Sequence, residues 1–331
     1  MPRRAALVRL LADGELHSGE ALAQALGVTR AAVAKQVRTL TRWGLGAESL
    51  PRRGYRLRAP LELLDAARIE SALGAEARAR LRTLEVHLEL DSTNSRLLAR
   101  SNLDPGRWYG CLAEFQSAGR GRRGREWLAP FGSGLCLSFA WLFRDPPAGL
   151  SALGLAAGVA IMRALGRLEI GGISLKWPND VLRDGGKLGG VLCELRAETA
   201  GPAYVVVGVG LNVRLPEKVR SEIVASGGVP PADLTEVAGG APPPSRALLA
   251  AALCDELVRM ACEFERRGFA PFIDEWSRAD ALRDRPVRVQ AHAAERDGVA
   301  RGIDTDGALC VELGGRVERL ASGEVTLRAV A

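Results

Sequence analysis

The sequence predicts an α+β protein in which a small helical N-terminal domain precedes a larger domain built on one main mixed sheet. In the central region, apolar runs of strand length alternate with helical stretches, but without the strict βαβ order of a doubly wound fold. The N-terminal region is set apart by charge, because residues 1–60 carry 11 basic and 4 acidic side chains while the rest of the chain is nearly neutral. This local excess predicts an anionic partner for the N-terminal domain.

Length and composition leave room for two or three domains, since the chain has 331 residues and is 47% hydrophobic. No apolar run approaches the roughly 20 residues that span a bilayer, and the N-terminus turns acidic too early for a signal peptide, so we expect a soluble, cytoplasmic protein. The six cysteines form no C-x-x-C pair and the three histidines stand far apart, which predicts buried thiols and no metal site. Because 41 of the 45 basic residues are arginine, the high pI alone is weak evidence for a nucleic-acid partner.

The first sixty residues predict a winged helix-turn-helix. After a first helix with apolar positions near residues 7–11, Ser18 can cap a second helix that Gly27 ends, and Thr29 can cap a third. The segment 51-PRRGYRLR-58 is typical of a basic β-hairpin, or wing. The expected inner face of the third helix is apolar and consists of Ala32, Val33, Val37 and Leu40.

Side chains on the outer face of that helix and on the wing are the expected DNA contacts. The alternative is a small helical packing module whose arginines are merely solvated, but the charge excess and the wing favour DNA. The candidate contacts are Thr29, Arg30, Lys35, Gln36, Arg38, Arg52 and Arg53. A proline-marked boundary near Ala59–Leu63 and a new amphipathic helix up to residue 73 then end the DNA-binding domain at about residue 60.

Strand-like runs dominate the central region, with a helix expected over residues 152–168. The expected strands are 84–90, 110–116, 134–143, 189–195 and 204–213. A loop joins the second of these strands to the third, with the sequence 116-QSAGRGRRGREW-127. Its G-x-G-x-x-G spacing does not indicate a dinucleotide site, because no helix can follow through Pro130 and Gly132 and because arginines fill the spacer positions.

The arginine loop (residues 117–130) permits two interpretations. It can be a merely solvated basic loop or an RGG-like contact with nucleic acid. Alternatively, it can be a mobile lid that closes when an anionic ligand offsets the repulsion between its guanidinium groups. The position of the loop between two buried strands favours the lid. Four guanidinium groups on a glycine-rich tether are not expected to pack unaided, and Trp127 is expected either over the ligand or against the sheet.

A second polar cluster lies in 175-LKWPNDVLRDGGKLGGVLCEL-195. Two of the four lysines of the chain, Lys176 and Lys187, fall here together with Asn179 and Asp180. A lysine ammonium is a compact charge that can bridge the oxygens of two anions, which points to an anion-binding site. The alternative is a turn with surface charges.

Five segments together resemble one family, the biotin–protein ligases. They are 92-STN-94, 116-QSAGRGRRGREW-127, 176-KWPND-180, 187-KLGGVLCEL-195 and 208-GVGLN-212. With the helix-turn-helix ahead of them, the chain is similar to the bifunctional biotin–[acetyl-CoA-carboxylase] ligases that also repress the biotin operon. The resemblance implies a class II synthetase-like catalytic domain over residues 64–280. It also implies an SH3-like β-barrel over residues 281–331, because 283–289 and 301–312 resemble that domain.

The resemblance implies that biotin and ATP are joined into biotinyl-5′-AMP and that biotin passes to a lysine of a biotin carboxyl carrier protein, with Mg²⁺ accompanying the triphosphate. It further implies that the adenylate is a corepressor for a homodimer on operator DNA. Two alternatives stay open at this stage. One is a ligand-sensing transcription factor with vestigial ligase activity, and the other is a ligase for another acyl group such as lipoate.

Residue roles follow from the same resemblance. The implied biotin-binding residues are Ser92, Thr93, Asn94, Gln116, Gly119, Arg120, Gly121, Arg122 and Lys187. The implied nucleotide-binding residues are Arg122, Arg125, Trp127, Lys176, Asn179, Asp180 and Asn212. The implied catalytic residues are Lys187, Arg122, Lys176 and Asp180, the last of which orients or deprotonates the acceptor lysine. Residues 221–246 lack the aromatic side chain that the family often places near the adenylate, and Val229 or another aliphatic residue is expected in its stead.

Overall fold

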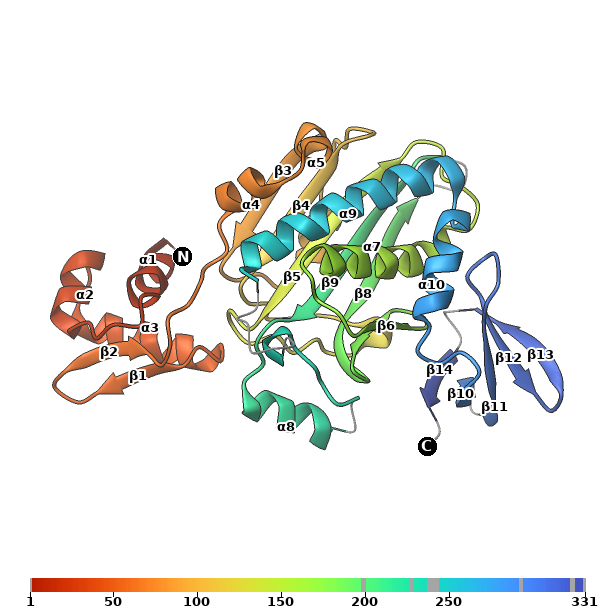
Figure 1. Ribbon diagram of the computed structural model, residues 1–331. Helices are drawn as coiled ribbons and strands as arrows, with labels where there is room; N and C mark the ends of the chain where they lie inside the picture. The colour runs from red at the N-terminus through yellow and green to blue at the C-terminus, as the bar shows by residue number, and fades with distance from the viewer. Residues whose placement is uncertain are drawn as a thin grey trace.

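The fold is seen in a computed structural model that describes residues 2–197, 201–226, 229–236, 244–291, 294–321 and 325–329. A helical domain at the N-terminus and a small β domain at the C-terminus lie at opposite ends of a central domain that combines a sheet with covering helices (Figure 1). The α+β prediction is therefore confirmed.

The N-terminal domain has the expected helix-turn-helix and wing. Its elements are α1 (Pro2–Leu11), α2 (Gly19–Leu26), α3 (Arg30–Arg42), β1 (Ala47–Leu50) and β2 (Gly54–Leu57). The hydroxyls of Ser18 and Thr29 accept hydrogen bonds from backbone N–H groups in the first turns of α2 and α3. Gly27 ends α2 with a φ of 59°, the left-handed conformation that favours glycine.

A mixed sheet forms the centre of the molecule. Its strands are β3 (Leu81–His87), β4 (Trp108–Ala113), β5 (Gly134–Phe143), β6 (Ile173–Lys176), β7 (Asp180–Arg183), β8 (Gly186–Ala197) and β9 (Ala203–Asn212). They lie in the order β3-β4-β5-β9-β8-β7-β6, where β3 and β4 are parallel and the other neighbours are antiparallel. The β6–β7 hairpin brings both ends of the KWPND segment to one edge of the sheet.

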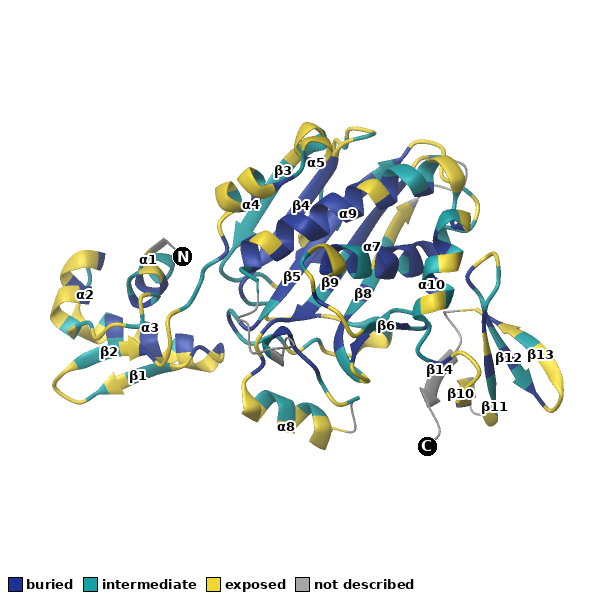
Figure 2. Ribbon diagram, in the orientation of Figure 1, coloured by how far each residue is buried: buried dark blue, intermediate teal, exposed yellow. Residues whose placement is uncertain are grey.

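Helices cover the two faces of the sheet unequally. The long helices α7 (Leu153–Arg167) and α9 (Arg246–Arg267) lie across one face, and their inner sides are buried with the strands (Figures 1 and 2). The short helix α6 (Thr93–Leu98) packs on the other face. The remaining helices are α4 (Ala66–Ala72), α5 (Ala75–Arg80), α8 (Glu217–Ala225) and α10 (Ile273–Ala279).

Strand β9 shows how the alternation of side chains divides the two faces. Odd-numbered residues of 205–211 join the large core beneath α7 and α9, whereas Tyr204 and Val206 belong to the core beside α6. The next positions on the α6 side are Gly208 and Gly210. The α6 face is therefore filled by side chains at one end of β9 and left open at the other end.

Residues Leu150–Arg167, which include α7, have the length and hydropathy of a membrane-spanning segment, so the expectation that no such run exists needs correction. Of the residues in this segment, 61% are buried within the fold. Its apolar composition is explained by its place between α9 and the sheet.

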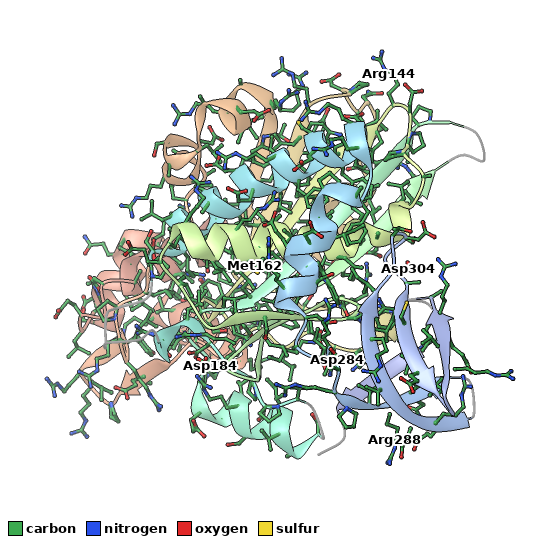
Figure 3. All side chains as sticks on the ribbon, turned by 45° about the vertical axis from the view of Figure 1, so that its right-hand side comes forward. Arg144, Met162, Asp184, Asp284, Arg288 and Asp304 are labelled. Atoms are coloured by element: carbon green, nitrogen blue, oxygen red, sulfur yellow. The ribbon has the colours of Figure 1, made fainter. Side chains whose placement is uncertain are left out.

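The C-terminal domain is an antiparallel sheet with the strand order β13-β12-β11-β10-β14. Its strands are β10 (Pro286–Ala291), β11 (Ala294–Ile303), β12 (Leu309–Leu313), β13 (Arg316–Leu320) and β14 (Val325–Ala329). Charged side chains such as Arg288 project from its surface (Figure 3). The domain contacts the central domain through Trp177, whose buried indole N–H donates to the carbonyl of Gly307 at 3.1 Å.

The N-terminal domain is attached to the central domain through Trp43, at the end of α3. Its ring stacks on Phe115 and Phe131, with centroid distances of 5.5 and 5.8 Å. The backbone N–H of Phe131 also donates to the carbonyl of Trp43 at 2.9 Å. Because Phe115 and Phe131 flank the arginine loop, the N-terminal domain rests on both ends of that loop.

Candidate active site

A pocket of about 500 Å³ opens where the arginine loop, the start of α6, the β6–β7 hairpin, β8 and β9 meet. Every residue that the sequence analysis assigned to biotin or nucleotide lines this pocket, except Gly119. Gly119 lies behind the wall, where a Cβ would stand 2.8 Å from the carbonyl oxygen of Trp127. Segments far apart in the sequence thus converge on one cavity.

One end of the pocket is a small, buried network of polar side chains. The backbone N–H and the hydroxyl of Thr93 donate to Gln116 Oε1 at 2.8 and 3.1 Å. The hydroxyl of Ser138, on β5, lies within hydrogen-bonding distance of both Thr93 Oγ1 and Asn94 Oδ1. This network fixes the orientation of Gln116, whose side chain also forms a hydrogen bond with the Cys136 thiol. The role of Ser138 was not predicted, because no motif includes it.

The two glycines of 208-GVGLN-212 make room for this end of the pocket. A Cβ on Gly208 would stand 2.4 Å from Asn94 Oδ1, and one on Gly210 would stand 2.6 Å from Trp127 Cε2. Contacts this short are not tolerated, so both positions require glycine. Trp127 consequently packs against β9. Of the two positions expected for it, over the ligand or against the sheet, the structure shows the second.

The arginine loop folds back on itself as a short hairpin beside the pocket. The N–H of Gly121 donates to the carbonyl of Arg125 at 2.7 Å, and the N–H of Trp127 donates to that of Gly119 at 2.9 Å. At its tip, Arg123 has a φ of 58°. These bonds hold the two arms of the loop together.

The expectation that the guanidinium groups of the loop cannot pack unaided is wrong for Arg120. Its Nη2 pairs with Glu194 at 3.3 Å and donates to Ser95 Oγ at 3.0 Å. For Arg122 the expected repulsion is present. Burial, followed by the nearby charge of Arg123, lowers the pKa of Arg122, and Asp180 acts in the opposite direction. An anion entering the pocket would offset this repulsion.

The second polar cluster, formed by Lys176, Asn179, Asp180 and Lys187, lines another part of the pocket. Lys187 Nζ lies 2.6 Å from Asp180 Oδ1 and 5.9 Å from the centre of the Trp127 ring. Asn179 is held by Val191, since Asn179 Nδ2 donates to the Val191 carbonyl at 2.8 Å. A movable ammonium beside a carboxylate and an aromatic ring is well suited to meet a ligand that carries both a carboxylate and a phosphate.

Aliphatic side chains from the segment after β9 line part of the pocket. Ile223, Val229 and Pro231 contribute to the wall. Residues 227–228 and 237–243 of this region lie outside the described residues.

The candidate DNA interface lies away from the pocket. Thr29, Arg30, Lys35 and Arg38 are exposed, as are Arg52 and Arg53 at the tip of the wing. Gln36 is only partly exposed. Its Oε1 atom is buried and has no hydrogen-bond partner among the described residues. Gln36 therefore fits the expected outer face less well than its neighbours.

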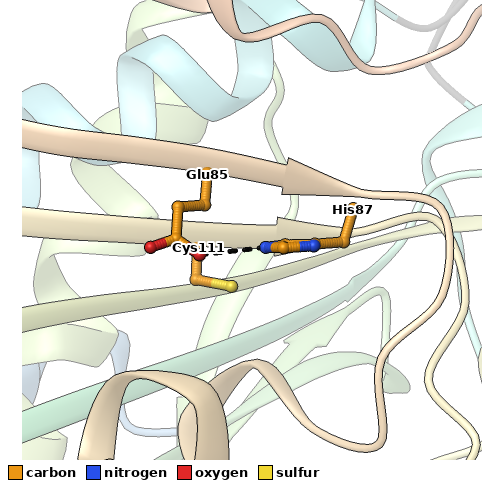
Figure 4. A group of neighbouring side chains, drawn as sticks. All are labelled: Glu85, His87 and Cys111. Atoms are coloured by element: carbon orange, nitrogen blue, oxygen red, sulfur yellow. Dashed lines mark hydrogen bonds and ion pairs between the residues drawn. The ribbon is translucent and has the colours of Figure 1, made fainter. Parts of the chain in front are cut away.

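A further cluster on β3 and β4 brings together Glu85, His87 and Cys111, with potential ligand atoms within 4.8 Å of one another (Figure 4). It is poorly suited to a metal. Arg96 and Arg100 pair with Glu85 at 2.8 and 2.7 Å, so cations already surround the carboxylate. Burial raises the pKa of the Cys111 thiol to about 12, which disfavours the thiolate that a metal needs.

Comparisons with known proteins agree with this geometry. Residues 89–212 match the biotin/lipoate A/B protein ligase family, residues 3–56 match an HTH domain, and residues 284–328 match the biotin protein ligase C-terminal domain. The bifunctional ligase/repressor BirA of Salmonella typhimurium is 40% identical over 98% of this chain and 97% of its own. The BirA of Escherichia coli is 39% identical over 98% of this chain and 96% of its own.

Among solved structures, the biotin protein ligase of Aquifex aeolicus in complex with biotin and ATP superposes with a TM-score of 0.60 at 25% identity, covering 76% of this chain and 99% of its own. The chain therefore belongs to the biotin protein ligase family. Its N-terminal HTH domain and its full-length likeness to the two BirA proteins place it with the bifunctional ligase/repressors of that family.

Proposed function

We propose that the pocket binds biotin and ATP side by side and joins them into biotinyl-5′-AMP. Biotin's carboxylate attacks the α-phosphorus of ATP, and pyrophosphate leaves. The amine of a carrier-protein lysine then attacks the carbonyl of the mixed anhydride, and AMP leaves. The observation that carries this proposal is the convergence of an amide and hydroxyl network, an arginine loop and a lysine–aspartate pair on one cavity.

The polarity of the pocket suggests how the two substrates lie. Ser92, Thr93 and Gln116 offer neutral donors and acceptors, which suit the ureido ring of biotin. Arg122 and Lys187 offer positive charge, which offsets the repulsion between a carboxylate and a phosphate and stabilises the charge that develops at phosphorus. We assign the nucleotide to the side formed by Arg125, Trp127, Lys176, Asn179, Asp180 and Asn212, with Ile223, Val229 and Pro231 against the adenine.

Asp180 is our candidate for the group that receives the acceptor lysine. In the structure it pairs with Lys187 at 2.6 Å. Once Lys187 turns to the adenylate, the carboxylate of Asp180 is released to orient an incoming ammonium and to accept its proton. We propose that Mg²⁺ arrives on the triphosphate.

For the N-terminal domain we propose binding to a two-fold symmetric operator of biotin-synthesis genes, with the adenylate as corepressor of a homodimer. The exposed basic residues of α3 and the wing support the DNA contact. DNA, biotin, ATP and a carboxyl carrier protein meet in the cytoplasm, where we place the protein.

A transfer assay tests the ligase function. The full chain is incubated with biotin, ATP, Mg²⁺ and an apo biotin carboxyl carrier domain, and biotinylation of the carrier is followed by mass spectrometry. We expect one biotin per carrier and no transfer when ATP is omitted. Labelling with lipoate in preference to biotin would reassign the substrate, and adenylate formation without transfer would indicate a ligand sensor.

A further inference from the structure

We propose that Glu194 is a positioning residue of the biotin site, where it fastens the arginine loop to the start of α6. The proposal rests on the biotin placement proposed above and adds a residue that none of those assignments includes. Glu194 lies on β8, and its side chain is 29% exposed. Among the described residues that line the pocket Leu192 appears and Glu194 does not, so Glu194 stands behind the wall and acts through other side chains.

Glu194 has partners from two segments. Asn94 Nδ2 donates to Glu194 Oε2 at 2.7 Å, and Arg120 Nη2 donates to Glu194 Oε1 at 3.3 Å. Arg120 Nη2 also donates to Ser95 Oγ at 3.0 Å. One carboxylate thus ties the loop and the first turn of α6 to the central sheet.

This arrangement also defines what Asn94 does. Its side-chain NH₂ donates to the Leu192 carbonyl at 3.1 Å and to Glu194, while its Oδ1 accepts from Ser138. Both amide hydrogens are therefore used within the protein. We assign Asn94 to the support of Thr93, and leave the direct polar contacts with the biotin ring to its neighbours.

The charge of Glu194 has a separate purpose from its hydrogen bond. Asn94 needs only an acceptor, which a glutamine oxygen supplies equally well. Arg120 gains from the negative charge, since a charge-assisted pair is stronger than a neutral hydrogen bond. The substitution Glu194→Gln can thus retain the bond to Asn94 and still remove the counter-ion of the loop.

A double-mutant cycle tests this division of roles. The four proteins are the parent chain, Glu194→Gln, Arg120→Gln and the double variant. The readouts are the KM for biotin, kcat, and the rate at which bound biotinyl-5′-AMP is released. The matched control is Glu318→Gln, which removes one carboxylate from an exposed pair with Arg296 in the C-terminal domain.

We expect Glu194→Gln to raise the KM for biotin and the release rate about two- to fivefold, because a half-exposed ion pair contributes modestly, with kcat nearly unchanged. In the Arg120→Gln background, Glu194→Gln should change the KM for biotin and the release rate by less than about 1.5-fold. Raising the salt concentration should bring the parent chain toward the Glu194→Gln values, since salt screens the pair. The control should match the parent chain throughout.

An equal effect of Glu194→Gln in both backgrounds would overturn the proposal, because Glu194 would then act without Arg120. The proposal would also be overturned if Glu194→Gln had no effect while Arg120→Gln weakened biotin binding. The proposed biotin site would stand in that case. If neither Arg120→Gln nor Glu194→Gln alters biotin binding or release, the placement of biotin beside the arginine loop is itself wrong.

Discussion

At some positions in this site, the residue type is determined by the space that neighbouring side chains occupy. Gly208 and Gly210 have no function of their own in the proposed chemistry. They are required because Asn94 and the Trp127 ring occupy the volume where their side chains would be. A change at either glycine therefore reaches the ligand through the residue packed on it.

The substitution Gly210→Ala tests this argument. The new methyl group would stand 2.6 Å from Trp127 Cε2, so the ring and the loop that carries it must move away from β9. Overpacking of this kind costs about 1–3 kcal/mol, and we expect release of the adenylate to quicken roughly five- to a hundredfold. The rate can be measured by chasing labelled adenylate from the protein.

A matched control is Gly166→Ala on α7, where an added Cβ has nothing within 4 Å. Because alanine favours a helix, this variant should keep the parental release rate and gain about 0.5–1 kcal/mol in its free energy of unfolding. Equal release rates for Gly210→Ala and the parent chain would mean that Trp127 does not hold the loop.

At the scale of secondary-structure elements, the wing can be tested by its charge. Arg52 and Arg53 are exposed in the turn between β1 and β2. Replacing both with alanine should weaken binding to all DNA sequences and reduce the slope of log K against log salt by about 1–2, because fewer counterions are released. Electrophoretic shifts of biotin-operon upstream DNA at several salt concentrations provide the measurement.

The control for the wing removes the same two charges elsewhere. Arg266 and Arg267 are exposed at the end of α9, and their replacement with alanine leaves the wing intact. If this control flattens the salt dependence as much as the wing variant does, net charge and not the wing governs the affinity.

Many of the helices and strands could be predicted from the sequence, because helix caps and long strands have strong local signals. Ser18, Gly27 and Thr29 predicted the limits of α2, and residues 134–143 predicted β5. The strands β6 and β7 have four residues each, too few for a periodic pattern to stand out. The ion pair of Glu194 could not be predicted, since it depends on how the loop folds over a distant strand.

At the scale of the whole molecule, Trp43 joins the regulatory and catalytic parts. It is 7% exposed and stacks on the two phenylalanines that flank the arginine loop. The ends of the loop therefore pack directly on the end of α3, the helix expected to contact DNA. This contact gives a physical route from ligand binding to the DNA-binding domain.

The substitution Trp43→Ala tests this route. Loss of a buried tryptophan should lower the free energy of unfolding of the N-terminal domain by about 3–5 kcal/mol, as read from denaturant titrations. It should also raise the KM for biotin, because Phe115 and Phe131 lose their packing. A parental KM combined with the expected loss of stability would show that the loop does not depend on the N-terminal domain.

The most direct test of the account is hydrogen exchange in the arginine loop, residues 117–130, with and without biotin and ATP together. The amides of Gly121 and Trp127 donate within the loop hairpin and report its closure. If adenylate formation closes the loop, their exchange should slow by about tenfold or more when both substrates are present, and much less with either alone. Equal exchange rates under all conditions would contradict the account, because the loop would then not respond to the ligand it is proposed to hold.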